Sequence, residues 1–345
     1  MARRGDTHRL LRWLWTSRRM DARLARAALL PAAGLWRAAG GVRLAAEARR
    51  WAGPDGVTLP VVGIDNLTVG DSGRGPLLVW MARHFAAQQV RPGIVVPEAA
   101  TARASQLRHA VPDALVETEL GGRSAGVQRL AEAGARVALL SGSAPPSSTL
   151  ASLGVMVIAA ESSRAVRWPV PAGPWREGWH ALERADLVVV TRRRAPVDAA
   201  DELAHELSAR SGHPAAIAQL GVRHLEGLVS GGERPASTLA GRRVVAASGS
   251  ADPGAFVANV KAAGAAVQVH TWHADGELRD EDVAWLANAT RRADYVVVSE
   301  RDAVQLRDRW PARVAEPLVA VLDLTWERGG DAVAAALDAL VPEKP

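Results

Sequence analysis

The chain has 345 residues, enough for one large or two ordinary domains, and its 48% hydrophobic and 23% charged residues are typical of a folded globular protein. It has no cysteine, which excludes disulfides, thiolate metal sites and cysteine nucleophiles. Residues 1–51 hold twelve arginines against three acidic residues, a net charge of +9, so the remainder carries −4 of the total +5. A basic segment on a slightly acidic body suggests that the segment binds an anionic surface, either nucleic acid or lipid.

Residues 1–51 also contain four tryptophans and one apolar run, Ala27–Trp36. The run is half of the about 20 residues that a membrane-spanning helix needs, and arginines flank it. Indole rings beside arginine suit the headgroup layer, so we predict an amphipathic helical segment on an anionic membrane surface. Two alternatives remain open: a secretory or twin-arginine signal at Ser17–Arg19, which Arg23 and Arg26 interrupt, and a helix packed on the protein's own body. Nucleic acid is not expected as a partner, because these aromatic residues are all tryptophans near an apolar run.

After residue 51, short apolar or β-branched runs alternate with segments of helix length. The predicted strands are Leu59–Ile64, Arg91–Val96, Ala135–Leu140, Val155–Ala159, Leu187–Thr191, Arg243–Ala247, Ala265–Thr271, Tyr295–Ser299 and Leu318–Asp323. The predicted helices are Leu77–Gln89, Ala125–Ala133, Ala199–Ala209, Pro253–Ala263 and Asp280–Arg292. This alternation predicts an α/β fold, a parallel sheet with helices on both faces.

Proline, glycine and serine indicate where domains meet. The segment 226–240 contains SGGERPAST, which is typical of a linker. We therefore predict four parts: the basic helical segment over 1–51, a larger α/β domain over 52–225, the linker over 226–240, and a smaller α/β domain over 241–345.

A glycine-rich loop, NLTVGDSGRGP, joins the first of these strands to its helix over Asn66–Pro76. A turn of this kind points backbone N–H groups and the positive end of a helix dipole at an anion. The sequence therefore predicts a phosphate-binding site. The expected binding residues are Thr68, Val69, Gly70, Asp71, Ser72, Gly73, Arg74 and Gly75.

Three positions of this loop depart from the usual chemistry. A P-loop has a lysine that reaches the β- and γ-phosphates, followed by a Ser or Thr hydroxyl that binds Mg²⁺. Here Arg74 stands at the lysine position and Gly75, which cannot hold a metal, at the hydroxyl position. Asp71 adds a carboxylate where phosphate oxygens would lie. We leave open whether Arg74 pairs with phosphate or with a carboxylate of the protein.

The loop resembles the N-[IL]-T-V-G-G-T-G-K-T-P loop of the tetraacyldisaccharide 4'-kinases, the lipid A 4'-kinases. Other segments are similar to that family in the same order: Leu29–Trp36 to its membrane-associated helix, Pro171–Glu177 to LPAGPLREP, Ala247–Phe256 to AGIGNPERF, and Ser299–Leu306 to TEKDAVKL. The chain is therefore identified as a divergent member of the family. The resemblance implies a P-loop-type α/β fold, ATP and Mg²⁺ as cofactors, and phosphoryl transfer to the 4'-hydroxyl of a lipid A disaccharide precursor. It also implies a peripheral place on the cytoplasmic face of the bacterial inner membrane.

Several chemical motifs of that family are replaced here. Its acidic DDGFQH run corresponds to Ser141–Ser148, its SRGYGG run to Pro97–Thr101, and its DHH cluster to Trp272–Gly276. The weak catalytic candidates that remain are His273, Asp275 and Asp302. His273 and Asp275 also fit a solvated loop pair, and Asp302 fits an acid at a helix start. No metal site is expected, because His270 and His273 have no carboxylate or cysteine beside them in the sequence.

Three hypotheses on function follow. The first is a kinase-family protein that binds a nucleotide or anionic lipid weakly and transfers phosphate slowly or not at all. The second is a non-catalytic scaffold that holds a lipid or a membrane-associated partner. The third is an active kinase whose base and metal ligands have moved to Asp113, Asp275, Glu300 or Asp302. The run Arg192–Arg194 after a strand is a further candidate for phosphate binding, although such runs are more often solvated.

Overall fold

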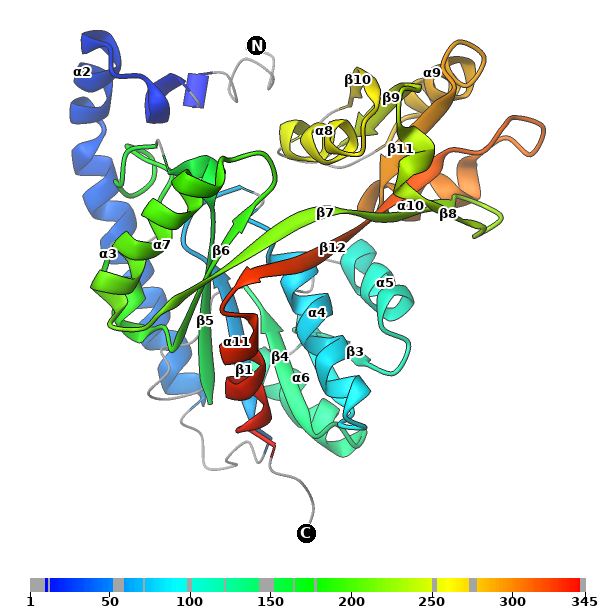
Figure 1. Ribbon diagram of the computed structural model, residues 1–345. Coiled ribbons are helices and arrows are strands. Elements are labelled where there is room, and N and C mark those ends of the chain that lie inside the picture. Colours follow the sequence, from blue (N-terminus) through cyan, green and yellow to red (C-terminus); the bar gives the residue numbers. More distant parts are fainter. Residues whose placement is uncertain are drawn as a thin grey trace. The chain divides into compact units, whose positions relative to one another are not determined.

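The computed structural model of the chain describes residues 10–11, 13–51, 59–70, 72–97, 101–120, 122–142, 152–163, 165–176, 179–249, 253–272 and 278–341. The chain forms two compact units (Figure 1). The first unit comprises residues 1–218 and 326–345, and the second comprises residues 219–325. The chain passes from one unit to the other within strands β7 (Ala215–Gly227) and β12 (Leu318–Arg328).

The first unit contains a sheet with β1 near its middle. Its strands are β1 (Val61–Asn66), β2 (Pro92–Val96), β3 (Leu115–Thr118), β4 (Val137–Ser141), β5 (Leu153–Ala159), β6 (Leu187–Arg192) and the first part of β7. Their order is β7-β6-β5-β1-β4-β2-β3, and β1 pairs in parallel with both β4 and β5. The carboxyl end of β1 therefore lies between two neighbouring strands, at the edge where parallel sheets commonly bind ligands.

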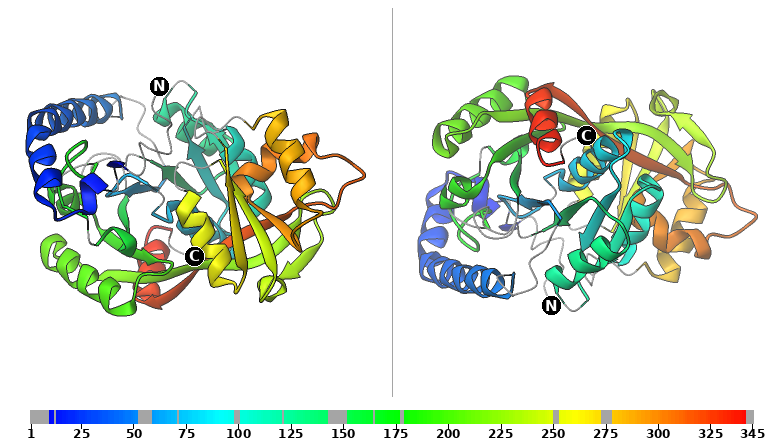
Figure 2. Two further views of the ribbon diagram at one scale, coloured as in Figure 1. Left: turned by 90° about the horizontal axis from the view of Figure 1, so that it is seen from above. Right: turned by 90° about the horizontal axis from the view of Figure 1, so that it is seen from below.

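Helices cover both faces of this sheet (Figure 2). The helices of the first unit are α2 (Met20–Ala28), α3 (Leu30–Trp51), α4 (Arg74–Ala87), α5 (Thr101–Ala110), α6 (Arg123–Glu132), α7 (Val197–Ser211) and α11 (Gly330–Asp338), with 3-10 turns η1 (Ala160–Ser162) and η2 (Trp179–Arg184). Alternate strand residues point to opposite faces. Leu140 thus packs with Leu130 of α6, and Ile158 packs with Leu203 of α7. Right-handed crossovers carry α4 and α5 along the other face.

The second unit is a smaller α/β layer. Its strands are β8 (Glu233–Pro235), β9 (Arg243–Ser248), β10 (Ala266–Thr271) and β11 (Tyr295–Ser299), with the adjoining parts of β7 and β12. Its helices are α8 (Pro253–Ala262), α9 (Asp280–Ala289) and α10 (Glu300–Leu306), with turns η3 (Ala236–Leu239) and η4 (Arg307–Arg309). The strand order is β10-β9-β11-β12-β7, and β8 pairs antiparallel with β7. Val245 packs with residues of α9 and α10, whereas Val244 packs with residues of α8.

The predicted α/β fold class is confirmed, and each predicted strand overlaps an observed one. Strands β3, β7 and β8 were not predicted. β7 begins with the short apolar run Ala215–Ala218, but from Gln219 onward it mixes apolar with polar residues and contains Gly221, so its pattern is not that of a buried strand. Residues 226–240, the predicted linker, hold the end of β7, β8 and η3. They are part of the second unit because Leu228 and Leu239 are fully buried in its core.

Candidate phosphate-binding site

The predicted loop joins β1 to α4 within the first unit. Gly70 (φ 110°) and Gly73 (φ 79°) have positive φ angles, which other residues rarely adopt. Gly73 is the N-cap of α4, so the helix begins at Arg74. The N–H groups of a first helical turn have no partners within the helix, so they face an anion placed at the loop. The loop and helix start contain the predicted residues Thr68, Val69, Gly70, Ser72, Gly73, Arg74 and Gly75, whereas Asp71 lies outside the described residues.

A segment distant in sequence holds the first half of the loop. Thr68 forms an antiparallel bridge with Trp175, whose side chain is fully buried. The backbone N–H of Val69 donates to the carbonyl oxygen of Pro174 at 2.8 Å. These contacts fix the conformation of the loop without a ligand. Pre-organisation of this kind lowers the entropy cost of binding.

The second half of the loop is held through Ser72. Thr191 of β6 donates from Oγ1 to the carbonyl oxygen of Ser72 at 2.7 Å. The hydroxyl of Ser72 is buried and makes no hydrogen bond to any described residue, and the same holds for the hydroxyl of Ser141, the last residue of β4. Buried hydroxyl groups usually have partners. These two are therefore donors that a phosphate oxygen would satisfy.

Three charged side chains meet at the carboxyl end of β1. The Asp65 carboxylate accepts a hydrogen bond from Nη1 of Arg176 at 2.7 Å and lies 3.5 Å from Nη1 of Arg74. Only 6% of the Asp65 side chain is exposed. A Cβ at Gly142 would lie 3.2 Å from Nη1 of Arg74, so this guanidinium is directed at the ends of β1 and β4. The cluster keeps one net positive charge, and Asp65 compensates part of the charge of Arg74.

These residues fit a phosphate group and do not fit Mg²⁺ in the manner of a P-loop. The donors include the start of α4, the Ser72 hydroxyl and two guanidinium groups. A loop-bound Mg²⁺ needs a hydroxyl at the position of Gly75, which has no side chain. The Asp65 carboxylate, at the end of β1, already binds two arginines. The geometry therefore favours an anion held by nitrogen and hydroxyl donors.

Of the three catalytic candidates, Asp302 is the one that lies among the described residues. His273 and Asp275 lie outside the described residues. Asp302 belongs to the second unit, where it accepts hydrogen bonds from the hydroxyls of Ser299 at 2.6 Å and Ser248 at 3.1 Å. Burial raises the pKa of Asp302, although these hydrogen bonds oppose the shift. Asp302 thus joins the carboxyl ends of β9 and β11 to the start of α10.

The Arg192–Arg194 run does not present an open anion site. The Glu161 carboxylate accepts hydrogen bonds from the backbone N–H groups of Arg193, Arg194 and Ala195 at 2.7, 2.9 and 3.1 Å. The side chain of Arg192 pairs with Glu327. The turn therefore binds a carboxylate of the protein itself.

A cavity of about 430 Å³ lies beside the charged cluster in the first unit. Its lining residues are Gly34, Arg37, Ala38, Gly40, Gly41, Arg176 and His180. Arg176 faces this cavity and also binds Asp65. The loop and the cavity thus share one basic side chain.

The sequence reasoning missed Asp65, Thr191 and Glu161. Asp65 stands directly before the loop, a position from which a strand-end carboxylate reaches a loop cation. Thr191 ends a predicted strand, and the same rule would have placed it near the loop. Glu161 had no such signal, because the backbone N–H groups that donate to its carboxylate lie 32 to 34 residues later.

Most of the chain matches one known protein family. The family model of tetraacyldisaccharide-1-P 4'-kinase matches residues 25–96 and 147–341. The unmatched interval, 97–146, contains α5, β3, α6 and β4. In the solved structure of LpxK from Aquifex aeolicus in complex with ATP, the fold is similar with a TM-score of 0.64 at 16% identity, covering 92% of this chain and 100% of that one.

Curated relatives give the same result. The tetraacyldisaccharide 4'-kinase of Anaeromyxobacter sp. (strain K) is 31% identical over 374 residues, covering 93% of this chain and 92% of the relative. That of Anaeromyxobacter sp. (strain Fw109-5) is 32% identical over 355 residues and covers 91% of each chain. That of Chelativorans sp. (strain BNC1) is 28% identical over 292 residues, covering 79% of this chain and 81% of the relative. The chain therefore belongs to the tetraacyldisaccharide-1-P 4'-kinase family.

Proposed function

We propose that this chain binds the phosphates of ATP at the loop Asn66–Pro76 and binds a lipid A disaccharide precursor, but transfers phosphate to the 4'-hydroxyl slowly or not at all. The observation that carries the proposal is the contact between Arg74 and Asp65, at 3.5 Å. The cation at the lysine position is thereby directed toward a carboxylate of the protein. A phosphate that enters the loop must share this cation with Asp65.

The lack of a Mg²⁺ ligand at position 75 of the loop is the second argument for slow transfer. Phosphoryl transfer needs charge neutralisation by a metal ion, a cation that follows the γ-phosphate, and an oriented base. When bound, Mg²⁺ supplies the first of these. Gly75 offers it no ligand. Binding without efficient transfer is the result that physical chemistry predicts for such a loop.

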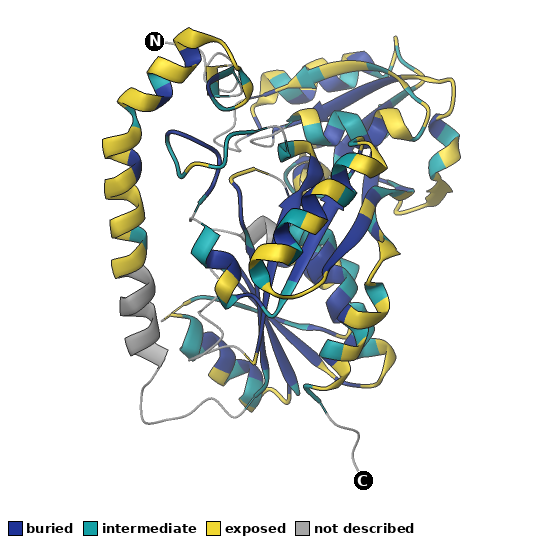
Figure 3. Cartoon of the chain, turned by 60° about the vertical axis from the view of Figure 1, so that its left-hand side comes forward, coloured by how far each residue is buried: buried dark blue, intermediate teal, exposed yellow. Residues whose placement is uncertain are grey.

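Membrane docking is the second part of the proposal. Helices α2 and α3 carry exposed apolar side chains: 65% of Leu24, 74% of Leu35 and 54% of Trp36 are exposed (Figure 3). Arg23 and Arg37 are exposed beside them. Apolar side chains together with arginine suit the headgroup layer of an anionic membrane, and we place this segment on the cytoplasmic face of the inner membrane. Among the described residues, no helix is both long enough and apolar enough to cross a membrane.

Other residues of the segment attach it to the first unit. The indole N–H of Trp15 donates to the carbonyl oxygen of Pro171 at 3.1 Å. Leu14, Ala22 and Ala33 are buried. One side of the segment is therefore packed on the protein, as the alternative interpretation of the sequence expects, while the apolar side chains of the other side support membrane docking.

The decisive experiment compares binding with turnover. ATP binding to the purified protein is measured by calorimetry with and without Mg²⁺, and transfer of labelled γ-phosphate to a tetraacyldisaccharide 1-phosphate is measured in mixed micelles. We expect weak ATP binding that changes little with Mg²⁺, and transfer far slower than that of the Anaeromyxobacter sp. (strain K) relative under the same conditions. Transfer at a comparable rate would overturn the proposal.

A double variant tests the cause. Arg74→Lys with Gly75→Thr restores the usual loop chemistry, so we expect it to make ATP binding dependent on Mg²⁺. Gly75→Ala alone is the control, because it adds a Cβ without a hydroxyl. If ATP binding depends on Mg²⁺ to the same extent in the double variant and in Gly75→Ala, the residues at positions 74 and 75 are not what limits Mg²⁺ binding. If wild type binds lipid but no ATP, the chain is a scaffold and the ATP part of the proposal is wrong.

A further inference from the structure

The second unit contains a group of metal-ligating side chains that the phosphate-binding site does not use. His224 and Glu226 lie on β7, and Glu233 lies on β8. Residues two apart on a strand point to the same face. Glu226 is directly opposite Glu233 in the antiparallel pairing of the two strands. The hairpin therefore brings one imidazole and two carboxylates together.

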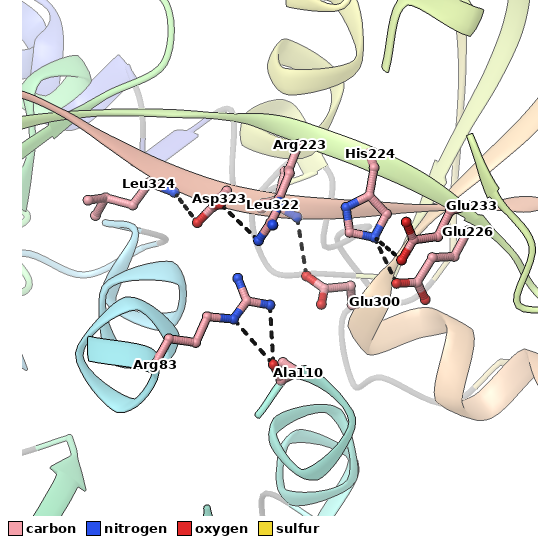
Figure 4. Close-up of polar contacts among 10 residues, drawn as sticks. All are labelled: Arg83, Ala110, Arg223, His224, Glu226, Glu233, Glu300, Leu322, Asp323 and Leu324. Carbon is pink, nitrogen blue, oxygen red and sulfur yellow. Dashed lines mark hydrogen bonds and ion pairs between the residues drawn. The ribbon is translucent and has the colours of Figure 1, made fainter. Parts of the chain in front are cut away.

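The ligand atoms are close enough to share one ion. Nε2 of His224 lies 2.9 Å from Oε1 of Glu226 and 3.9 Å from Oε1 of Glu233 (Figure 4). All three ligand atoms lie within 4.8 Å of one another. Tetrahedral bonds of about 2.1 Å place neighbouring ligand atoms about 3.4 Å apart, and the two observed distances lie on either side of that value.

The two carboxylates provide an independent argument. Like charges directly opposite each other on paired strands destabilise the pair. Here Glu226 and Glu233 occupy opposed positions, with the imidazole nitrogen of His224 directed at both. A divalent cation between them would turn this repulsion into attraction. The side chains of His224 and Glu226 are only 18% and 15% exposed, whereas 74% of Glu233 is exposed, so the group is held in place yet open to solvent on one side.

The donor set selects the class of ion. An imidazole nitrogen favours transition metals and zinc, and carboxylates accept the same ions at about 2.0–2.2 Å. Mg²⁺ is a poorer match, because it prefers an octahedron of oxygen ligands. Three protein ligands leave one position of a tetrahedron for water.

We propose that His224, Glu226 and Glu233 form a binding site for Zn²⁺ or a similar transition-metal ion, which cross-links β7 to β8 in the second unit. The cross-link would hold the short edge strand β8, whose three residues are all exposed, on its neighbour. This inference does not depend on the proposed function.

Calorimetry with ZnCl₂ and the full chain, free of any histidine tag, tests the proposal. We expect one Zn²⁺ per chain. The affinity for Zn²⁺ should fall by about tenfold or more in His224→Ala and in Glu233→Gln. Glu233 is exposed, so its variant folds even if His224→Ala does not. Zn²⁺ should also raise the Tm of wild type but not that of Glu233→Gln.

Two matched controls separate this site from adventitious binding. His213→Ala removes an exposed histidine of the first unit, and Glu281→Gln removes a carboxylate that is 75% exposed in the second unit. Both controls should bind Zn²⁺ as wild type does. Stoichiometric binding that survives Glu233→Gln and His224→Ala would overturn the proposal, and so would a wild type that binds no Zn²⁺, in which case the group is only an ion pair.

Discussion

Nη1 of Arg74 lies 3.5 Å from Oδ1 of Asp65, so the first residue of α4 is ion-paired with the strand that precedes its own loop. Arg176 binds the same oxygen at 2.7 Å. Asp65 is thus a carboxylate within the anion site, and it competes with any phosphate for two guanidinium groups. Its removal should strengthen the binding of anions, which is opposite to the usual effect of removing a buried charge that is paired.

Asp65→Asn should increase the affinity for ATP or for inorganic tripolyphosphate by about fivefold, because an ion pair with a partly exposed arginine is worth about 1 kcal/mol. Asparagine keeps a carbonyl oxygen for Arg176 while it removes the negative charge. Calorimetry without Mg²⁺ measures the change. Asp338→Asn is the control, since it removes a carboxylate 2.7 Å from His84 at the opposite end of α4. Equal or lower affinity in Asp65→Asn would show that Asp65 does not compete with the ligand.

Arg74→Ala provides the opposite test of the same site. Loss of this guanidinium should weaken tripolyphosphate binding by about tenfold, because charge-assisted hydrogen bonds to phosphate contribute about 1.5–3 kcal/mol before the remaining donors compensate. Fluorescence or calorimetric titration measures the effect. Arg129→Ala, which removes a partly exposed arginine paired with Glu117 at 3.0 Å, should leave the affinity unchanged. Unchanged binding in Arg74→Ala would mean that Asp65 holds this arginine permanently.

The positions of most strands along the chain could be predicted, because parallel strands buried on both faces are continuous apolar runs. Val137–Ser141 and Tyr295–Ser299 are examples, and the sequence pattern locates both to within two residues. β7 could not be found in this way. Its thirteen residues pass from one compact unit to the other, and their environment changes from buried to half-exposed along the strand.

The candidate site was predictable where chemistry is local. Gly70 and Gly73 are spaced as a phosphate-binding turn requires, and both have positive φ angles. The pairing of Asp65 with Arg176 was not predictable, because 111 residues separate them. Nothing in a strand-end aspartate alone indicates which distant cation the fold will bring to it. The contact between Thr191 and Ser72 could not be predicted for the same reason, because these residues are 119 residues apart.

Trp175→Ala should lower the free energy of unfolding by about 3–5 kcal/mol, the usual cost of truncating a fully buried aromatic side chain. The Trp175 ring is 1% exposed and packs against Trp179 at 4.5 Å between ring centroids. Its backbone bridges Thr68, so the loop should also lose order and affinity for tripolyphosphate. Urea denaturation measures the stability. Trp168→Ala, at a position 39% exposed, should cost clearly less, and equal costs would contradict the role assigned to Trp175.

Glu161→Gln should destabilise the protein at neutral pH and matter less in acid. Burial opposes ionisation of Glu161, but backbone hydrogen bonds from Arg194, Arg193 and Ala195 outweigh it and keep the pKa below the ordinary value of 4.5. A lowered pKa means that the charged form stabilises the fold. That stabilisation is fully present above pH 4.5 and is lost as the pH falls through the lowered pKa of the folded state.

Urea denaturation at neutral pH should therefore show a difference of about 1 kcal/mol between wild type and Glu161→Gln, a value reduced by solvent screening of a partly exposed group. The difference should shrink when the measurement is repeated well below pH 4.5. Glu132→Gln, on the surface of α6, is a control that should show no such dependence. A difference that stays constant with pH would mean that the Glu161 charge does not contribute.

Leu35→Ser combined with Trp36→Ser should release the protein from anionic vesicles. Both side chains are more than half exposed on α3, at 74% and 54%, so the substitutions cost little folding stability while they remove apolar area from the docking surface. Each large apolar side chain buried in the interface contributes about 1.5–3 kcal/mol, so binding should weaken by at least about tenfold. Co-sedimentation with phosphatidylglycerol-containing vesicles measures the effect. Leu120→Ser, at a position 60% exposed after β3, is the matched control and should bind as wild type does. If both variants sediment equally with the vesicles, another surface docks on the membrane. If high salt releases wild type and the double variant still binds at low salt, the arginines bind the membrane without help from the apolar side chains.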